Sequence, residues 1–324
     1  RPRPGKDLTL SIDRRIQYLA YRQLKAAMQE HQARAASAVV LDVKSGEVIA
    51  MVNQPSFNPN NRQRLRSASM RNRAVTDVFE PGSTMKPFIA ASALESGRYL
   101  PETPVSTTPG WMRVGANTVR DVHDYGELDL SGVIRKSSNV GISKVALSLP
   151  AEDIWSFLTE LGFGAQTYSG FPGEATGLLS NHGGWNAIET ATLSFGYGVS
   201  VTALQLAQAY AVLATGGIKR SVTFLREGEV TEERRVLPVA VALQVRNMLE
   251  QAAGPNGTAP QARVAGYRVA GKTGKVKKSS AGGYSSKQYL AVFAGMAPAS
   301  DPRFVMVVMV DDPSNGKYYG GQVA

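Results

Sequence analysis

The sequence predicts an α+β domain: a largely antiparallel five-stranded sheet flanked by helices, with a helical insert between the first strands and the last. Two observations lead to this prediction. Short apolar runs typical of strands occur only near the two ends of the 324-residue chain, and the segment between them shows apolar residues at helical spacing. Strands from both ends of a chain that join one sheet across intervening helices favour an antiparallel α+β architecture over a doubly wound one.

The first elements are a helix and a hairpin. Residues 11–13 (Ser-Ile-Asp) offer a polar helix cap, and the amphipathic stretch behind them ends before residue 36. Its apolar face is formed by Ile16, Leu19, Leu24 and Met28. Residues 37–43 and 47–52 are mostly apolar and are joined by a turn ending in Gly46, where glycine suits a positive φ. We therefore predict two paired strands early in the chain.

The middle of the chain is predicted to be helical, and the C-terminal part to return to strands. Within an insert of about residues 54–250, helical spacing covers 86–96, 130–149, 154–161 and 203–214. Late strands are predicted at 267–270, 289–297 and 304–310. We interpret residues 1–324 as one domain, because a chain of this length can bury one large core.

The composition excludes several kinds of chemistry. The sequence contains no Cys, so thiolate nucleophiles, disulfides and Cys-ligated zinc are excluded. The three histidines, His31, His123 and His182, lie in unrelated contexts without an HExxH spacing, and we interpret them as surface or loop histidines. We therefore expect no metal ion and no cofactor.

The charge balance favours anionic partners without choosing among them. A formal net charge of +10 suits nucleic acid, anionic lipid or an acidic cell wall. The densest basic stretch comprises Arg62, Arg64, Arg66, Arg71 and Arg73. No aromatic residue lies between them, as a base-stacking surface would need, so we interpret the stretch as a solvated loop face and expect no nucleic-acid partner. The longest apolar run, residues 304–310, is far too short for a membrane helix.

A serine and a lysine stand three residues apart at the start of a predicted helix. Ser83 follows Pro81 and Gly82, and Lys86 should share its helix face. A serine hydroxyl needs a base to become nucleophilic. Because histidine is scarce, Lys86 with a pKa lowered by burial or positive neighbours is the natural candidate. Taken alone, the pattern fits a simple helix N-cap better than a catalytic pair.

Two further motifs follow in the chain. Ser137 and Asn139 are two residues apart in a region that passes from helix to loop, so both could face one cleft. At the end of a predicted strand, Lys272 and Thr273 could bind a carboxylate, and Gly274 would let a substrate approach the backbone. The ordered set SxxK, SxN and KTG is typical of serine β-lactamases and penicillin-binding proteins.

From about residue 7 to residue 324 the chain resembles the transpeptidase domain of class B penicillin-binding proteins, most of all the division-specific penicillin-binding protein 3 group. The stretches that carry the resemblance are 79–87 (FEPGSTMKP), 136–141 (KSSNVG), 195–198 (FGYG), 272–274 (KTG) and 318–321 (YYGG). The resemblance implies the fold shared by serine β-lactamases and D,D-transpeptidases.

The same resemblance implies a role for each motif residue. Catalytic roles fall to Ser83, Lys86, Ser137 and Asn139, and substrate binding to Lys272, Thr273, Gly274 and Lys275. Ser83 is the acylated nucleophile, Lys86 is its base, and Ser137 and Asn139 relay protons and hold the substrate. Lys272 and Thr273 bind the substrate carboxylate.

Lys275 departs from the family, which has Thr or Ser directly after KTG. The family uses the backbone N–H at this position for the oxyanion, and any residue except Pro can supply it. The long cation in place of a short hydroxyl either points to solvent or alters carboxylate recognition.

A rival interpretation comes from residues 266–273, which satisfy the GxxxxGK[ST] pattern of P-loop NTPases. A P-loop must lead into a helix, whereas residues 267–270 are predicted as strand and 274–283 as loop. Only 51 residues follow Thr273, too few for the remaining parallel units of a nucleotide-binding core. We therefore set ATP binding aside.

The resemblance implies a peptidoglycan D,D-transpeptidase that cross-links stem peptides in septal cell-wall synthesis and is inhibited by β-lactams. The alternatives within the same fold are a D,D-carboxypeptidase, a β-lactamase and a non-enzymatic β-lactam sensor domain. We recognise no acidic deacylation base of the class A β-lactamase kind, so we expect a long-lived acyl-enzyme.

The expected partners are peptidoglycan stem peptides, β-lactam antibiotics as covalent inhibitors, and division and cell-wall synthesis proteins. By the same resemblance, the full-length protein is held at the periplasmic face of the bacterial inner membrane by a single-pass anchor. We expect that anchor and its pedestal to lie upstream of this sequence.

Overall fold

A five-stranded antiparallel sheet forms the centre of the molecule. The structure, a computed structural model, describes residues 5–61, 67–226, 233–280, 283–317 and 319–324. The strand order is β2-β1-β11-β10-β9, and every neighbouring pair is antiparallel. These strands are β1 (Ala35–Asp42), β2 (Val48–Gln54), β9 (Ala270–Ser280), β10 (Gly283–Ala297) and β11 (Phe304–Asp311). Strands from both ends of the chain share one sheet, so the predicted α+β class is confirmed.

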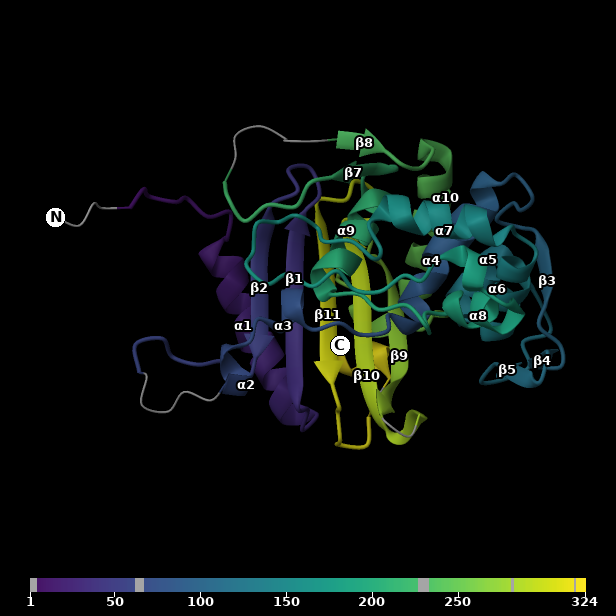
Figure 1. The fold of residues 1–324 in the computed structure, drawn as a ribbon, viewed down its shortest axis with the longest axis horizontal. Coiled ribbons are helices and arrows are strands. Elements are labelled where there is room, and N and C mark those ends of the chain that lie inside the picture. The colour runs from purple at the N-terminus through teal and green to yellow at the C-terminus, as the bar shows by residue number, and fades with distance from the viewer. Residues whose placement is uncertain (1–4, 62–66, 227–232, 281–282, 318) are drawn as a thin grey trace.

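Helices cover both faces of this sheet, and alternate residues of β1 serve two apolar cores. On one face, Ala36 and Ala38 cluster with Leu24 of α1 (Arg14–Glu30), a helix capped by the Asp13 carboxylate. On the other face, Val39 belongs to the main core around α9 (Ala203–Ala214), which lies in front of the sheet in Figure 1. Because α9 is buried on almost every side, it is the central helix of the domain.

A lobe of helices stands beside the β9 edge, at the right of Figure 1. It contains α4 (Lys86–Glu95), α5 (Leu130–Lys136), α6 (Asn139–Leu147), α7 (Ala151–Leu161) and α8 (Ala187–Leu193), while α10 (Val239–Ala253) packs on β9. The shorter helical segments are α2 (Ser67–Met70), α3 (Arg73–Thr76), η2 (Gly82–Met85), η3 (His182–Gly184), η4 (Pro260–Ala262) and α11 (Gly320–Val323).

The segment between residues 54 and 250 contains strands as well as helices. Three small antiparallel sheets pair β3 (Pro104–Ser106) with β6 (Glu127–Asp129), β4 (Trp111–Val114) with β5 (Asn117–Arg120), and β7 (Ile218–Arg220) with β8 (Glu233–Arg235). Within the described part of the chain, no helix is both long and apolar enough to cross a membrane.

Several predicted elements have wrong boundaries; the strand predicted at 289–297, for example, begins at Gly283 as β10. The helix predicted at 130–149 is divided into α5 and α6, because Ser137 adopts a left-handed conformation with φ 60° and ψ 39°. The late strand begins only at Ala270 and then continues to Ser280, through most of the stretch predicted as loop. β9 is the edge of the sheet, and Lys277 in this stretch is exposed there.

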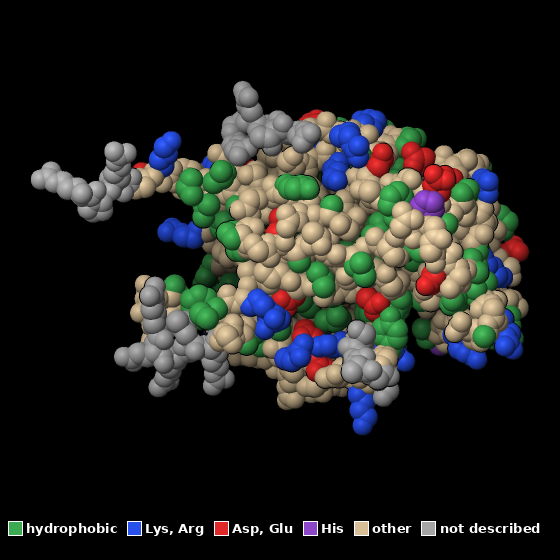
Figure 2. Space-filling model, viewed as in Figure 1, with side chains coloured by type: hydrophobic (Ala, Val, Ile, Leu, Met, Phe, Trp, Pro, Cys, Tyr) green, Lys and Arg blue, Asp and Glu red, His purple; other side chains and the backbone are tan. Residues whose placement is uncertain are grey.

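The basic stretch and the histidines are only partly as predicted. Three members of the stretch, residues 62, 64 and 66, lie outside the described residues. Arg71 and Arg73 both bind Asp77, and Arg73 is buried instead of solvated. His31, at the end of α1, is buried as well. On the face drawn in Figure 2, Lys and Arg side chains are spread among Asp and Glu and do not form one basic patch.

Candidate active site

Ser83 lies in a short 3₁₀ turn that leads directly into α4. The turn, η2, begins with Gly82 at φ 57°, where a side chain would collide with the Val276 Cγ2 atom of β9 at 2.6 Å. From the opposite side, the buried Tyr210 hydroxyl of α9 donates a hydrogen bond to the Thr84 carbonyl at 2.9 Å. Sheet and central helix thus fix the turn, while Ser83 itself is half-buried at the edge of a cavity.

Lys86, the first residue of α4, is completely buried beneath this turn. Its Nζ donates to the Ser137 carbonyl at 2.5 Å, the Ser137 Oγ at 3.1 Å and the Asn139 Oδ1 at 2.7 Å. Burial, and secondly the charge of Lys272, lowers the pKa of Lys86 well below its ordinary value, while Asp121 opposes the shift. A neutral amine has a lone pair, which can take the proton of a serine hydroxyl.

Ser137 connects the first lysine to a second one. The Lys272 Nζ donates to the Ser137 Oγ at 2.9 Å, so this hydroxyl lies between two buried amines. Burial lowers the pKa of Lys272 to about 7. The left-handed conformation of Ser137 costs about 1–2 kcal/mol, and its hydrogen bonds to the lysines help to offset that cost. We call Lys86, Lys272, Ser137 and Asn139 the amine cluster.

Asp121, which the sequence analysis missed, holds the Ser137–Asn139 segment in place. Its carboxylate accepts hydrogen bonds from the Ser138 Oγ at 2.5 Å and from the backbone N–H groups of Asn139 at 2.5 Å and Val140 at 3.0 Å. It thereby caps the N-terminus of α6. No sequence signal identifies it, because an acid 17 residues before its partner forms no local pattern.

The Lys272–Gly274 motif lies within the edge strand β9. The Thr273 Oγ1 hydrogen-bonds the Thr258 Oγ1 at 2.9 Å. Gly274 is required by close packing, since a Cβ there would stand 2.9 Å from the Pro81 carbonyl oxygen. Lys272 and Thr273 belong to a strand and not to a turn that opens a helix, which removes the structural context of a P-loop.

Lys275 does not simply point to solvent. It is half-buried, and its Nζ lies 4.1 Å from the centre of the Tyr319 ring and 5.6 Å from that of Tyr289. Distances of this size are typical of cation–π contacts. We call Lys275, Tyr289 and Tyr319 the cationic rim.

The Phe195–Gly198 stretch packs against the turn that carries Ser83. Gly196 has φ 85° and accepts the Gly82 N–H at 3.2 Å, and a Cβ at Gly196 would lie 2.2 Å from the Gly82 carbonyl oxygen. The Glu80 Oε1 accepts from the Gly198 N–H and from the Tyr284 hydroxyl, both at 2.8 Å. Glu80 therefore ties the β9–β10 hairpin to this stretch and to η2.

A cavity of about 420 Å³ brings the motifs together. It is lined by Ser83, Val122, His123, Tyr125, Lys136, Ser137, Asn139, Phe195, Tyr197, Thr258, Thr273, Gly274, Lys275, Tyr319, Gly320 and Gly321. Of the predicted site residues, only Lys86 and Lys272 do not line it, because both lie beneath its surface. His123, interpreted as a surface or loop residue, lies at its wall, and Tyr318 is outside the described residues.

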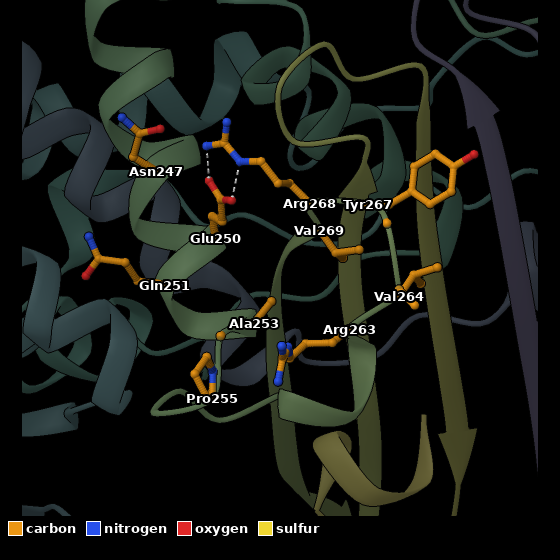
Figure 3. A pocket seen from close by; sticks show the side chains of 13 residues that line it. Asn247, Glu250, Gln251, Ala253, Pro255, Arg263, Val264, Tyr267, Arg268 and Val269 are labelled. Carbon is orange, nitrogen blue, oxygen red and sulfur yellow. Dashed lines mark hydrogen bonds and ion pairs between the residues drawn. The ribbon is translucent and has the colours of Figure 1, made fainter.

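A second cavity, of about 1040 Å³, lies between the C-terminal part of α10 and residues 263–269 (Figure 3). There the Arg268 Nε donates a hydrogen bond to the Glu250 Oε1 at 2.5 Å, and the Arg268 Nη2 donates one to the Glu250 Oε2 at 2.6 Å. The two side chains thus form an ion pair with each other. None of the motif residues lines this cavity, so we place the active site at the smaller one.

Fold and site together have the arrangement expected of the penicillin-recognising proteins. Comparison with known proteins identifies the family: residues 36–324 match the model described as "Penicillin binding protein transpeptidase domain", and the chain belongs to this family. The predicted resemblance is thereby confirmed.

Individual relatives cover almost the whole of this chain. The peptidoglycan D,D-transpeptidase FtsI of Escherichia coli is 44% identical over 318 residues, 98% of this chain and 54% of that protein. PenA of Neisseria meningitidis is 43% identical over 323 residues, 100% of this chain and 55% of that protein. The transpeptidase domain of Burkholderia pseudomallei penicillin-binding protein 3 superposes with a TM-score of 0.90 at 43% identity, covering 99% of this chain and 93% of that one. The chain thus spans about half the length of these two curated relatives.

Proposed function

We propose that the chain is the catalytic domain of a peptidoglycan D,D-transpeptidase. The Ser83 Oγ attacks the carbonyl carbon of a D-Ala-D-Ala peptide bond, its proton passes to the neutral Lys86 amine, and D-Ala leaves with a proton. An amine of a neighbouring stem peptide then attacks the acyl-enzyme ester, forms the cross-link amide and returns Ser83 to its starting state. The observation that carries this proposal is the complete burial of Lys86 next to the turn of Ser83.

The other members of the amine cluster receive roles from their contacts. We assign Ser137 to proton relay, because its hydroxyl lies between the amines of Lys86 and Lys272. Asn139 binds Lys86 through Oδ1 and lines the cavity, so it can hold both the base and the substrate. On β9, we assign Thr273 and Lys272 to the substrate carboxylate: Thr273 from the cavity wall, and Lys272 from beneath it through its charge.

The last two residues of the β9 motif, Gly274 and Lys275, contribute through close packing and through a backbone N–H group. Gly274 lets η2 and β9 approach closely. We assign the backbone N–H groups of Ser83 and Lys275 to the tetrahedral oxyanion, because both residues line the cavity and donors fixed in advance stabilise developing charge.

Slow hydrolysis is the feature that separates this proposal from a β-lactamase. Among the described residues that line the cavity, none is Asp or Glu, so no carboxylate there can activate a water against the ester. A long-lived penicilloyl-enzyme supports a transpeptidase, carboxypeptidase or sensor, and the products formed from stem peptides distinguish these three.

The first test is acylation by a labelled penicillin, followed by mapping of the adduct by peptide mass and measurement of its lifetime, with Ser83→Ala as the control. A stable adduct on Ser83 is expected. Rapid turnover would instead indicate a β-lactamase, and an adduct that survives Ser83→Ala would overturn the mechanism. Incubation with a pentapeptide donor and an amine acceptor should yield a cross-linked dimer; only trimmed tetrapeptide would indicate a carboxypeptidase, and no turnover a sensor.

We further propose that the full-length protein acts in septal wall synthesis at the periplasmic face of the inner membrane. An upstream anchor and division proteins as partners belong to this proposal. It is supported by the 44% identity to the E. coli protein named FtsI. Depletion of the protein in its host should produce filaments without septa, and normal division after depletion would contradict the septal role.

A further inference from the structure

Tyr210 is the largest fully buried side chain in the described part of the chain. It belongs to the central helix α9, and its ring packs edge-to-face on the ring of Phe88 in α4, with 5.3 Å between the ring centres. A phenylalanine would make the same ring contact. A hydroxyl, in contrast, loses its water on burial and is tolerated there only with a hydrogen-bond partner. The partner of this hydroxyl therefore indicates what Tyr210 contributes beyond packing.

The partner lies one residue after Ser83. The Tyr210 hydroxyl donates to the Thr84 carbonyl at 2.9 Å, and Thr84 is itself completely buried. Burial raises the pKa of Tyr210 well above its ordinary value, so the hydroxyl keeps the proton that it donates. On the β9 side Thr84 has little room to move, because a Cβ at Gly274 would stand 3.2 Å from its Cγ2 atom. Thr84 is thus held between α9 and β9.

The turn that carries Ser83 needs such support from outside, because α4 has Pro87 in its first turn. Proline has no N–H, so the Ser83 carbonyl cannot receive the bond from residue 87 that a regular α-helix would provide. The Lys86 N–H bonds this carbonyl instead, three residues ahead, as in a 3₁₀ turn. Hydrogen bonds in 3₁₀ turns have poorer geometry than those in α-helices. The bonds within η2 therefore fix Ser83 less firmly than a regular helix would, and the Tyr210 hydrogen bond adds a restraint from the core.

We propose that Tyr210 is a positioning residue for acylation: its hydroxyl fixes the Thr84 carbonyl and thereby the position of Ser83 relative to Lys86. Tyr210 does not line the active-site cavity, so it acts through the η2 turn and not through contact with the substrate. This inference rests on the proposed function, since it concerns the rate at which Ser83 is acylated.

Tyr210→Phe tests the inference, because it keeps the ring and removes only the donor. Acylation is followed with a chromogenic cephalosporin over a range of concentrations, which separates the rate constant at saturation from the concentration that gives half of the maximal rate. We expect the rate constant at saturation to fall about tenfold, an effect of the size that a buried carbonyl without its donor can have. The concentration for half of the maximal rate should stay nearly constant, because Tyr210 is not part of the cavity wall.

Gln208→Met is the matched control on the same helix. The buried Gln208 side chain also donates to a distant backbone carbonyl, that of Arg220 at 3.0 Å, but Arg220 lies in β7 and not next to Ser83. Loss of this bond should lower the free energy of unfolding, as Tyr210→Phe does, and leave the acylation rate constant unchanged. A second readout is the fraction of molecules that a labelled penicillin finally modifies. A misplaced Ser83 lowers the rate constant and leaves this fraction complete, whereas partial unfolding lowers the fraction.

The outcomes distinguish this inference from the proposed function. Equal rate constants in wild type and Tyr210→Phe would overturn the role of Tyr210 and leave the proposed function intact. Equal losses of rate in Tyr210→Phe and Gln208→Met, or a reduced labelled fraction with an unchanged rate constant, would show that the hydroxyl only stabilises the fold. If the wild type is not acylated on Ser83, the proposed function fails and the inference fails with it.

Discussion

The amine cluster and the cationic rim are two groups of residues on one cavity, and they place lysines in opposite environments. In the amine cluster, Lys86 is fully buried and three oxygen atoms surround its Nζ. At the rim, the ammonium of Lys275 lies against aromatic rings and its side chain is only partly buried. Burial penalises the charged form of an amine, whereas solvent contact preserves it. The same side chain can therefore be a base in one place and a cation in the other.

The largest effect is expected from removing Lys86, the proposed base in the amine cluster. Lys86→Met keeps the volume of the side chain but cannot take the proton of Ser83, and general-base catalysis typically contributes about 10²- to 10⁴-fold. The second-order rate constant for acylation by a labelled penicillin should fall by that factor. Lys25→Met, an exposed substitution on α1, is the control for adding a methionine. An unchanged acylation rate constant in Lys86→Met would show that Lys86 is not the base. The contrast between the amine cluster and the cationic rim would then fail.

A smaller effect is expected from Asp121, a positioning residue that acts on the cluster through α6. Asp121→Asn weakens the cap on Asn139 and Val140, and a misplaced catalytic group can cost about 10²-fold. The Asp121 charge also opposes the lowering of the pKa of Lys86, so its removal should lower that pKa further.

The pH profile of acylation separates this role from a purely structural one. If acylation needs neutral Lys86, its rise with pH should shift to lower pH in Asp121→Asn. A reduced rate with an unshifted profile would mean that Asp121 supports the fold alone.

The effect of burial on an amine can also be tested at Lys272, through the pH dependence of the free energy of unfolding. Its pKa is about 7 in the folded protein, against an ordinary value of 10.5, so between these pH values the unfolded chain binds more protons than the folded one. This difference makes the free energy of unfolding rise with pH, by about 1 kcal/mol per pH unit, and Lys272→Met should abolish that part of the slope. Urea unfolding at pH 7.5 and pH 9 measures it, with exposed Lys25→Met as the control. Equal slopes in wild type and Lys272→Met would show that burial does not perturb this amine.

The smallest effect is expected at the β9–β10 hairpin, from the Tyr284 hydroxyl, which donates a hydrogen bond to Glu80. Tyr284→Phe removes one partly exposed hydrogen bond to a carboxylate, worth about 1 kcal/mol. Acylation should slow about twofold to fivefold, and amide hydrogens at the start of β10 should exchange faster. Tyr267→Phe, whose side chain is 64% exposed and lies at the other cavity, is the matched control. Identical amide hydrogen exchange at the start of β10 in Tyr284→Phe and wild type would show that the Tyr284–Glu80 hydrogen bond does not hold the hairpin.

Local signals predicted the parts of the fold that depend on local periodicity. The apolar runs of β1 and β11 and the capped start of α1 at Asp13 were placed to within a few residues. The prediction failed where neighbours distant in sequence decide the conformation. The continuous helix over 130–149 is broken at Ser137, whose contacts are lysines 51 and 135 residues away. The start and end of β9 depend on its pairing with β10, which local composition does not encode.

The sequence alone determined which chemical groups this protein can use: a serine three residues before a lysine, almost no histidine, no cysteine, and the ordered motifs that place it in its family. The tertiary structure decided the environment of those groups. It buries Lys86 and Lys272 around Ser137, brings Asp121 to the start of α6, and sets Lys275 against two tyrosine rings. Solvation and through-space charge determine whether an amine is a base or a cation, and both depend on residues that meet only after folding.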